Sequence, residues 1–141
     1  MSPATGRHWA GRPLEERGSW RRRPRVVRNS SNAPWSAAER ELHRILREAG
    51  IDGWFGNWAL RLGGRLWVLD VAVPRLRFAI EVNGFEFHGS RQAFLADHEK
   101  LATLQEAGWL VLSVTWPMLQ DPVTLLRRIR RLTAMAERLA R

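Results

Sequence analysis

The sequence contains no cysteine. Disulfide bonds, thiolate zinc sites and cysteine nucleophiles are therefore excluded, so that any metal must be held by oxygen or imidazole ligands. No apolar run approaches the roughly 18 residues that a membrane span requires, and the N-terminus lacks the apolar core of a signal peptide. We therefore expect a soluble, cytoplasmic protein with no membrane partner.

Lysine is nearly absent as well. Lys100 is the one lysine among 23 basic residues, and the other 22 are arginines, whose planar guanidinium groups suit phosphate. The formal net charge is +9. Residues 1–34 contain eight arginines and two glutamates, a net charge of +6, which leaves +3 for residues 35–141. The positive charge is thus concentrated in the N-terminal segment.

The chain of 141 residues suits one folded domain, which would bury roughly two-thirds of its unfolded surface. Residues 1–34 are rich in Arg, Ser, Pro and Gly and predict a disordered basic tail, while residues 35–141 form the domain. Two interpretations of the tail stay open. It is either a solvated segment or an arm whose arginines neutralise nucleic-acid phosphates, among them Arg21, Arg22, Arg23 and Arg25.

Hydrophobic periodicity predicts the elements of the first half of the domain. A helix spans residues 36–50, beginning at a capping box of Ser36 and Glu39 and ending at Gly50. Two strands flank a turn at residues 63–64, and the second, from about residue 66 to 73, stops at Pro74. A third strand covers residues 76–84, with Glu81 on one of its faces.

The second half begins with a helix over residues 91–107 and a short strand over 109–115 that we expect to be buried on both faces. Asp121 caps a last helix with Leu139 inward and a basic outer face, which is either merely solvated or a phosphate-binding surface that includes Arg127, Arg128 and Arg131. The order α-β-β-β-α-β with an added C-terminal helix predicts an α/β fold with a mixed sheet of about four strands.

Asp70 and Glu81 are the first candidate site residues. Asp70 lies inside an apolar strand, where an ionised carboxylate is costly unless it is paired or bound to a metal. A tight antiparallel connection to the next strand would set Glu81 nearly opposite it, and two such carboxylates favour Mg²⁺ between them. The alternative is that Glu81 lies at a solvated edge and that Asp70 pairs with an arginine, for which Arg61, Arg65 and Arg77 are candidates.

Three further side chains are candidates by their positions. His88 follows the third strand and a glycine that permits a bend toward the carboxylates. The alternative is that this lone histidine is a surface or core residue with no catalytic role. Asp97 falls on the apolar stripe of its helix and could orient His88 or bind a second metal, or else pair with Lys100 one turn later. Glu39 could reach the site, although the capping box already explains it.

These residues resemble a known family. Asp70, "FAIEVNGFEFHG", Asp97 and "LQEAGWLVLSVTW" are together similar to the very-short-patch-repair-like endonucleases of the PD-(D/E)XK superfamily, over residues 36–120. The resemblance implies a restriction-endonuclease-like core. It implies a bacterial, Mg²⁺- or Mn²⁺-dependent endonuclease, with Asp70, Glu81 and the Val82 carbonyl as metal ligands. His88 would activate the attacking water, with Asp97 supporting it and Glu39 matching a frequent first-helix glutamate.

The sequence departs from the family pattern at three points. Asn83 stands where relatives have lysine or aspartate, so that metal affinity is weakened unless the amide carbonyl suffices. In this superfamily the lysine can move to the following helix, which makes Lys100 a candidate. The structural zinc site of the mismatch-repair members needs cysteine, which is absent, and of their wedging aromatics only Phe87 is matched. Specificity for G·T mismatches is therefore not expected.

The leading hypothesis is a metal-dependent endonuclease that nicks or cuts DNA in defence, mobile-element or repair processes, as a monomer or homodimer. A second hypothesis is a catalytically weakened nucleic-acid-binding module, in which Asn83 replaces the catalytic residue. A third is a toxin that cleaves RNA. Salt-sensitive binding without divalent-dependent cutting would favour the second, and degradation of RNA before duplex DNA the third.

Overall fold

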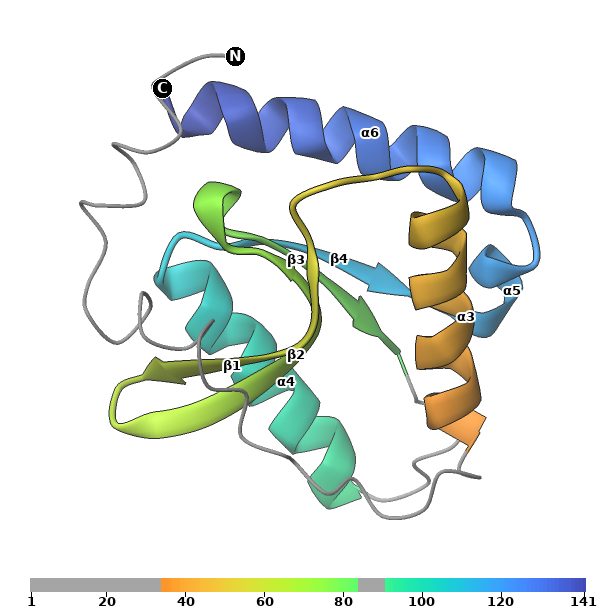
Figure 1. Ribbon diagram of the computed structural model, residues 1–141. Coiled ribbons are helices and arrows are strands. Elements are labelled where there is room, and N and C mark those ends of the chain that lie inside the picture. The colour runs from red at the N-terminus through yellow and green to blue at the C-terminus, as the bar shows by residue number, and fades with distance from the viewer. Residues whose placement is uncertain (1–33, 84–90) are drawn as a thin grey trace.

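The computed structural model describes residues 34–83 and 91–141. Its elements follow the predicted order and confirm an α/β fold (Figure 1). They are α3 (Pro34–Glu48), β1 (Phe55–Leu62), β2 (Arg65–Val73), the 3-10 helix η1 (Pro74–Leu76), β3 (Phe78–Val82), α4 (Arg91–Glu106), β4 (Leu110–Val114), α5 (Trp116–Leu119) and α6 (Pro122–Leu139). Among the described residues, no helix is both long and apolar enough to cross a bilayer.

The described strands form one mixed sheet in the order β1-β2-β3-β4, so that β1 and β4 are its edges. The pairs β1/β2 and β2/β3 are antiparallel, and β3/β4 is parallel. Gly63 and Gly64 have φ values of 59° and 77°, as the two central residues of a type I′ hairpin turn require. This turn and the β2/β3 connection through Pro74 fix the register of the central strands.

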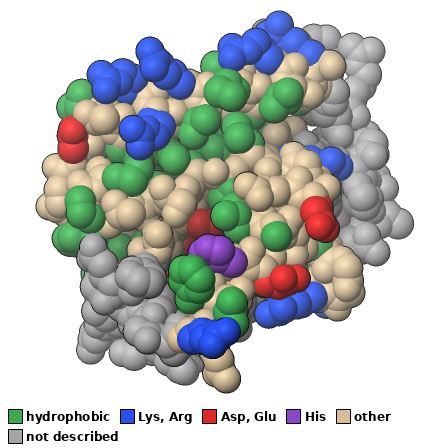
Figure 2. Space-filling model, turned by 180° about the vertical axis from the view of Figure 1, so that it is seen from behind, with side chains coloured by type: hydrophobic (Ala, Val, Ile, Leu, Met, Phe, Trp, Pro, Cys, Tyr) green, Lys and Arg blue, Asp and Glu red, His purple; other side chains and the backbone are tan. Residues whose placement is uncertain are grey.

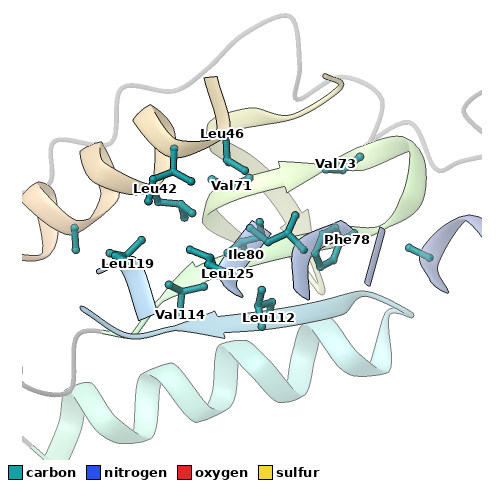
Figure 3. Close-up of a cluster of buried hydrophobic side chains, with 14 of the residues drawn as sticks. Leu42, Leu46, Val71, Val73, Phe78, Ile80, Leu112, Val114, Leu119 and Leu125 are labelled. Carbon is teal, nitrogen blue, oxygen red and sulfur yellow. The ribbon is translucent and has the colours of Figure 1, made fainter. Parts of the chain in front are cut away.

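Helices cover both faces of the sheet. The larger apolar cluster joins the sheet to α3, α5 and α6, and includes Leu42, Leu46, Leu119 and Leu125. Figure 3 shows its side chains on one side of β4 and α4 on the other. A smaller cluster, with Trp58 and Leu104, packs beneath α4. Because each buried leucine or valine contributes on the order of 2 kcal/mol, these two layers hold the central strands in place.

Several boundaries differ from the sequence prediction. Helix α3 begins at Pro34, so Ser36 lies within the helix rather than at its N-cap, and the predicted capping box is wrong. Proline suits a first helical position because its φ is already helical and it needs no N–H partner there. At the other end of the chain, Leu139 is exposed rather than inward. Asp121 does cap α6, accepting a hydrogen bond from the Thr124 N–H.

The strand over 109–115 is not buried on both faces. It is an edge strand, in which Ser113 is exposed and Leu110 and Val111 are half-buried. The sequence prediction treated an apolar run as central, but β4 is covered by α4 only over part of one face. The short helices η1 and α5 were also missed, since each is too short to show a hydrophobic period.

Candidate active site

Asp70 is anchored where β2 passes β3. Continuing the β2/β3 register by one residue from the pair Val71–Ile80 places Asp70 across from Glu81. The Asp70 side chain is buried, with 2% of its surface exposed, and its Oδ2 accepts a hydrogen bond from the Val82 N–H at 2.8 Å. A carboxylate bound to a main-chain N–H in this way keeps one orientation.

Glu81 lies beside Asp70, and its side chain is also largely buried. Burial is the largest cause that raises the pKa of the Glu81 carboxyl well above its ordinary value of 4.5, and the neighbouring Asp70 charge raises it further. Lys100 opposes this shift, because its Nζ lies 2.8 Å from Glu81 Oε1. Glu81 is therefore not at a solvated edge, and Lys100 contacts it from α4 rather than pairing with Asp97.

Lys100 connects the carboxylates to the backbone of β2. Its ammonium also donates to the Val68 carbonyl, and its side chain is only 17% exposed, as is that of Glu81. Asp70, Glu81 and Lys100 thus form a cluster with two acidic groups and one basic group. When both carboxyls are ionised the cluster carries a net charge of −1, which favours binding of a further cation.

The alternative partners considered for Asp70 make other contacts. Arg61 donates to the Gly64 carbonyl, Arg65 lies 4.0 Å above the ring centroid of Trp67, and Arg77 donates to the Ala107 carbonyl. These contacts tie the arginines to the hairpin and to the end of α4.

A cleft of about 300 Å³ opens beside Glu81. It lies between α4 and the ends of β3 and β4 and is lined by Glu81, Val82, Asn83, Phe94, Asp97, His98, Lys100, Leu101, Leu104, Val111 and Ser113. The structure therefore brings four of the predicted side chains, Glu81, Asn83, Asp97 and Lys100, to one cleft. Asp70 is buried behind it.

Asp97 is exposed, which corrects the expectation that it lies on the buried stripe of its helix. The helix α4 has 16 residues, about 24 Å, whereas β4 has five residues, about 16 Å. The helix therefore extends beyond the strand, and its first turns, including Phe94 and Asp97, project past the sheet. Asp97 reaches the cleft from this projecting part.

Other predicted residues lie elsewhere. Glu39 is buried on α3 and does not line the cleft. Arg127, Arg128 and Arg131 are exposed on α6, which packs on the opposite face of the sheet from α4. Figure 2 shows basic side chains gathered along the edge of the molecule where α6 runs. His88, Phe87 and the tail arginines at 21, 22, 23 and 25 lie outside the described residues.

Two histidines were missed by the sequence prediction. His98 lines the cleft one turn after Phe94, and a helical wheel of α4 would have placed the two residues on one face. His43 lies on α3, one turn after Glu39, and its Nε2–H donates to the Asp70 main-chain carbonyl at 3.0 Å. No sequence pattern indicates that second contact, because it depends on how α3 crosses β2.

His43 is a positioning residue for the strand that carries Asp70. Its ring also packs against Trp54, with centroids 5.2 Å apart, and against the backbone of Gly56. A Cβ added to Gly56 would lie 2.7 Å from His43 Cε1, closer than two carbons can approach. Glycine at position 56 therefore leaves room for the ring that holds the Asp70 carbonyl.

We predict that Gly56→Ala lowers the free energy of unfolding by about 1–3 kcal/mol, because the added methyl overpacks the contact. Urea denaturation measures this loss. In a His43→Ala background, where the ring is absent, the same substitution should have a much smaller effect. An equal loss in both backgrounds would show that the ring contact is not the cause.

The described residues contain no cluster of three or more His, Asp or Glu side chains that could hold a metal. Asp70 and Glu81 are nevertheless a donor set that fits Mg²⁺, which often binds through one or two carboxylates and completes its shell with water and substrate phosphate. The raised pKa of Glu81 points the same way, since a divalent cation would offset the repulsion that raises it.

Comparison with known proteins gives one structural likeness and two sequence likenesses, while no family model matches. The catalytic domain of the homing endonuclease I-Bth0305I superposes with a TM-score of 0.56 and 26% sequence identity, over 70% of this chain and 94% of that domain. Two uncharacterized proteins of Mycobacterium tuberculosis, from strains CDC 1551 / Oshkosh and ATCC 25618 / H37Rv, are each 34% identical over 70 residues.

Those 70 residues are 49% of this chain and 26% of either mycobacterial protein, so the match spans about a quarter of the length of these relatives. The structural likeness extends over most of the described domain. The chain therefore has the α/β fold of an endonuclease catalytic domain, and this likeness supports a nuclease function.

Proposed function

We propose that the protein is an endonuclease that hydrolyses phosphodiester bonds of DNA with Mg²⁺ or Mn²⁺, and that it belongs to the very-short-patch-repair-like group of the PD-(D/E)XK superfamily. One observation carries the proposal. Asp70 and Glu81 meet beside Lys100 at the edge of a cleft, within a fold similar to a homing endonuclease catalytic domain.

Asp70, Glu81 and the Val82 carbonyl would hold the metal ion. When bound, the ion supplies positive charge that polarises a phosphodiester and lowers the pKa of water. The protein's own part is to fix these ligands. The Val82 N–H orients Asp70, and His43 holds the main chain of the same residue.

Lys100 takes the role that the superfamily usually gives to a lysine on the strand. An ammonium has three donors, and Glu81 and the Val68 carbonyl engage two of them. The third can bind a phosphate oxygen or the attacking water in the cleft. Because Lys100 supplies this charge from α4, an uncharged Asn83 directly after β3 is compatible with catalysis.

His88 is the proposed general base, since an imidazole titrates near working pH, and Asp97 is its proposed support from the cleft wall. The arginines of α6 and of residues 21–25 would bind backbone phosphates of the nucleic acid other than the reacting phosphate. The proposed substrate is DNA, and the likeness to a homing endonuclease catalytic domain supports a nuclease that acts on a polynucleotide.

The direct test incubates the full chain with supercoiled plasmid, single-stranded DNA and RNA, with Mg²⁺ or Mn²⁺ and with EDTA. We expect nicking or linearisation of DNA that depends on the divalent ion. Binding without cutting would instead identify a binding module, for which Asn83→Asp should restore activity. Faster degradation of RNA than of DNA would overturn the choice of substrate.

A further inference from the structure

The first turns of α4 carry an aromatic pair at the mouth of the cleft. The rings of Phe94 and His98 lie one helical turn apart with centroids separated by 4.2 Å and planes inclined at 34°. Phe94 is 43% exposed, and both residues line the cleft. The pair therefore presents aromatic surface to whatever enters beside Glu81.

The other residues that line the cleft form an apolar wall on one side and a polar wall on the other. Leu101, Leu104 and Val111 give it an apolar wall, which continues the surface of Phe94. On the β3 and β4 side, Glu81, Asn83 and Ser113 supply carboxylate, amide and hydroxyl groups. An apolar cleft of about 300 Å³ with a few polar groups is at the small end of the range for ligand sites, a size that suits one flat ring system.

We infer that this cleft receives one unstacked nucleobase of the nucleic-acid substrate, which stacks on the Phe94–His98 pair. The inference rests on the proposed function for the identity of the polymer. A base inside a paired duplex cannot reach such a surface, whereas an unpaired or extruded base exposes a face that aromatic side chains bind regardless of sequence. The preferred substrate class is therefore single-stranded or locally unpaired DNA.

The position of the cleft fits this occupant. Glu81 and Lys100 line it, so the base it holds belongs to a nucleotide next to the phosphate that would react beside the carboxylate pair. The chain's net charge of +9 further favours a polyanion over a neutral apolar ligand. Lys100 would contact the reacting phosphate at the edge of the cleft, arginines elsewhere would contact other phosphates, and the apolar part of the cleft would contact the base.

The test measures binding of fluorescent oligonucleotides to the full chain by anisotropy in EDTA, where no metal-dependent cutting occurs. The probes are a single strand, a matched duplex, and a duplex with one unpaired nucleotide, each also made with an abasic site at successive positions. Phe94→Ala and His98→Ala remove the aromatic pair. Leu95→Ala is the matched control, because Leu95 is 53% exposed on the same helix and does not line the cleft.

We expect the wild type to bind the single strand and the unpaired probe more tightly than the matched duplex. Phe94→Ala should weaken that binding on the order of 10- to 100-fold, and the effect should vanish when the abasic site occupies the position of the stacked base. Leu95→Ala should bind like the wild type. A Phe94→Ala effect equal to that of Leu95→Ala, or one unchanged by every abasic site, would overturn the inference.

These outcomes are separate from those that decide the proposed function. If the protein does not cut DNA but shows a Phe94-dependent preference for unpaired bases, the base site is supported and the nuclease proposal is contradicted. Divalent-dependent cutting without that preference would do the reverse. Thermal denaturation of Phe94→Ala and of the conservative Phe94→Leu checks that both variants are folded.

Discussion

The Glu81→Gln protein should cleave DNA on the order of 10³-fold more slowly than the wild type while binding it with similar affinity in EDTA. Glutamine keeps the size of the side chain but removes the charge that Glu81 would give to a metal ion, and metal-ion catalysis is worth several kcal/mol. Single-turnover cleavage with Mg²⁺ or Mn²⁺ measures the loss. Asp70→Asn should show a loss of similar size.

Glu99→Gln is the matched control, because Glu99 is an exposed carboxylate on α4 that does not line the cleft. A thermal shift separates metal binding from turnover. Mg²⁺ or Mn²⁺ should raise the melting temperature of the wild type and of Glu99→Gln, but not that of Glu81→Gln, since a ligand stabilises only the state that binds it. Cleavage by Glu81→Gln at the wild-type rate would remove the carboxylate pair from the mechanism.

The sequence predicts the pairing of Asp70 with Glu81 because both the strand period and the tight connection at Pro74 are local properties. A two-residue periodicity and a short turn leave few registers, because a shift by one residue would exchange the two faces of β3. Helical periodicity likewise identifies α4, but of its predicted inward stripe Leu104 is buried whereas Phe94 and Asp97 are exposed. The order of the elements and the pairing of the two carboxylates therefore follow from patterns that are local in the chain.

What the sequence does not predict depends on packing between distant elements. The contact of Lys100 with Glu81 and the Val68 carbonyl requires the crossing of α4 over two strands. From the sequence alone, Asp97, three residues earlier on the same helix, is the partner that helical spacing offers to Lys100. The exposure of Asp97 likewise depends on how far α4 extends beyond the end of β4. Helix periodicity does not predict this difference in length.

Lys100→Met should produce the largest loss of stability among single substitutions at the site. The ammonium is the one cation of a largely buried cluster with two carboxyls, and its removal leaves their repulsion unopposed. We expect the free energy of unfolding to fall by about 3 kcal/mol, the lower end for breaking a buried ion pair. Urea denaturation in EDTA measures this loss of stability. Arg91→Met is the control, because it removes an exposed cation from the same helix.

The loss should depend on pH in a defined direction. The pKa of Glu81 is raised in the folded protein, so its contribution to stability is full below the ordinary value of 4.5 and is lost as the pH rises through the raised pKa. Without the ammonium, that pKa is higher still. The gap between Lys100→Met and the wild type should therefore widen as the pH rises above the raised pKa of the wild-type Glu81 carboxyl.

A double variant separates charge balance from catalysis. Glu81→Gln combined with Lys100→Met removes one acid and one base, leaving Asp70 bound to the Val82 N–H. Because no pair of carboxylates then remains, the double variant should recover most of the stability that Lys100→Met loses, with little of its pH dependence. Cleavage should stay as low as in Glu81→Gln. If the double variant is as unstable as the sum of the two single changes, the three side chains do not act as one cluster.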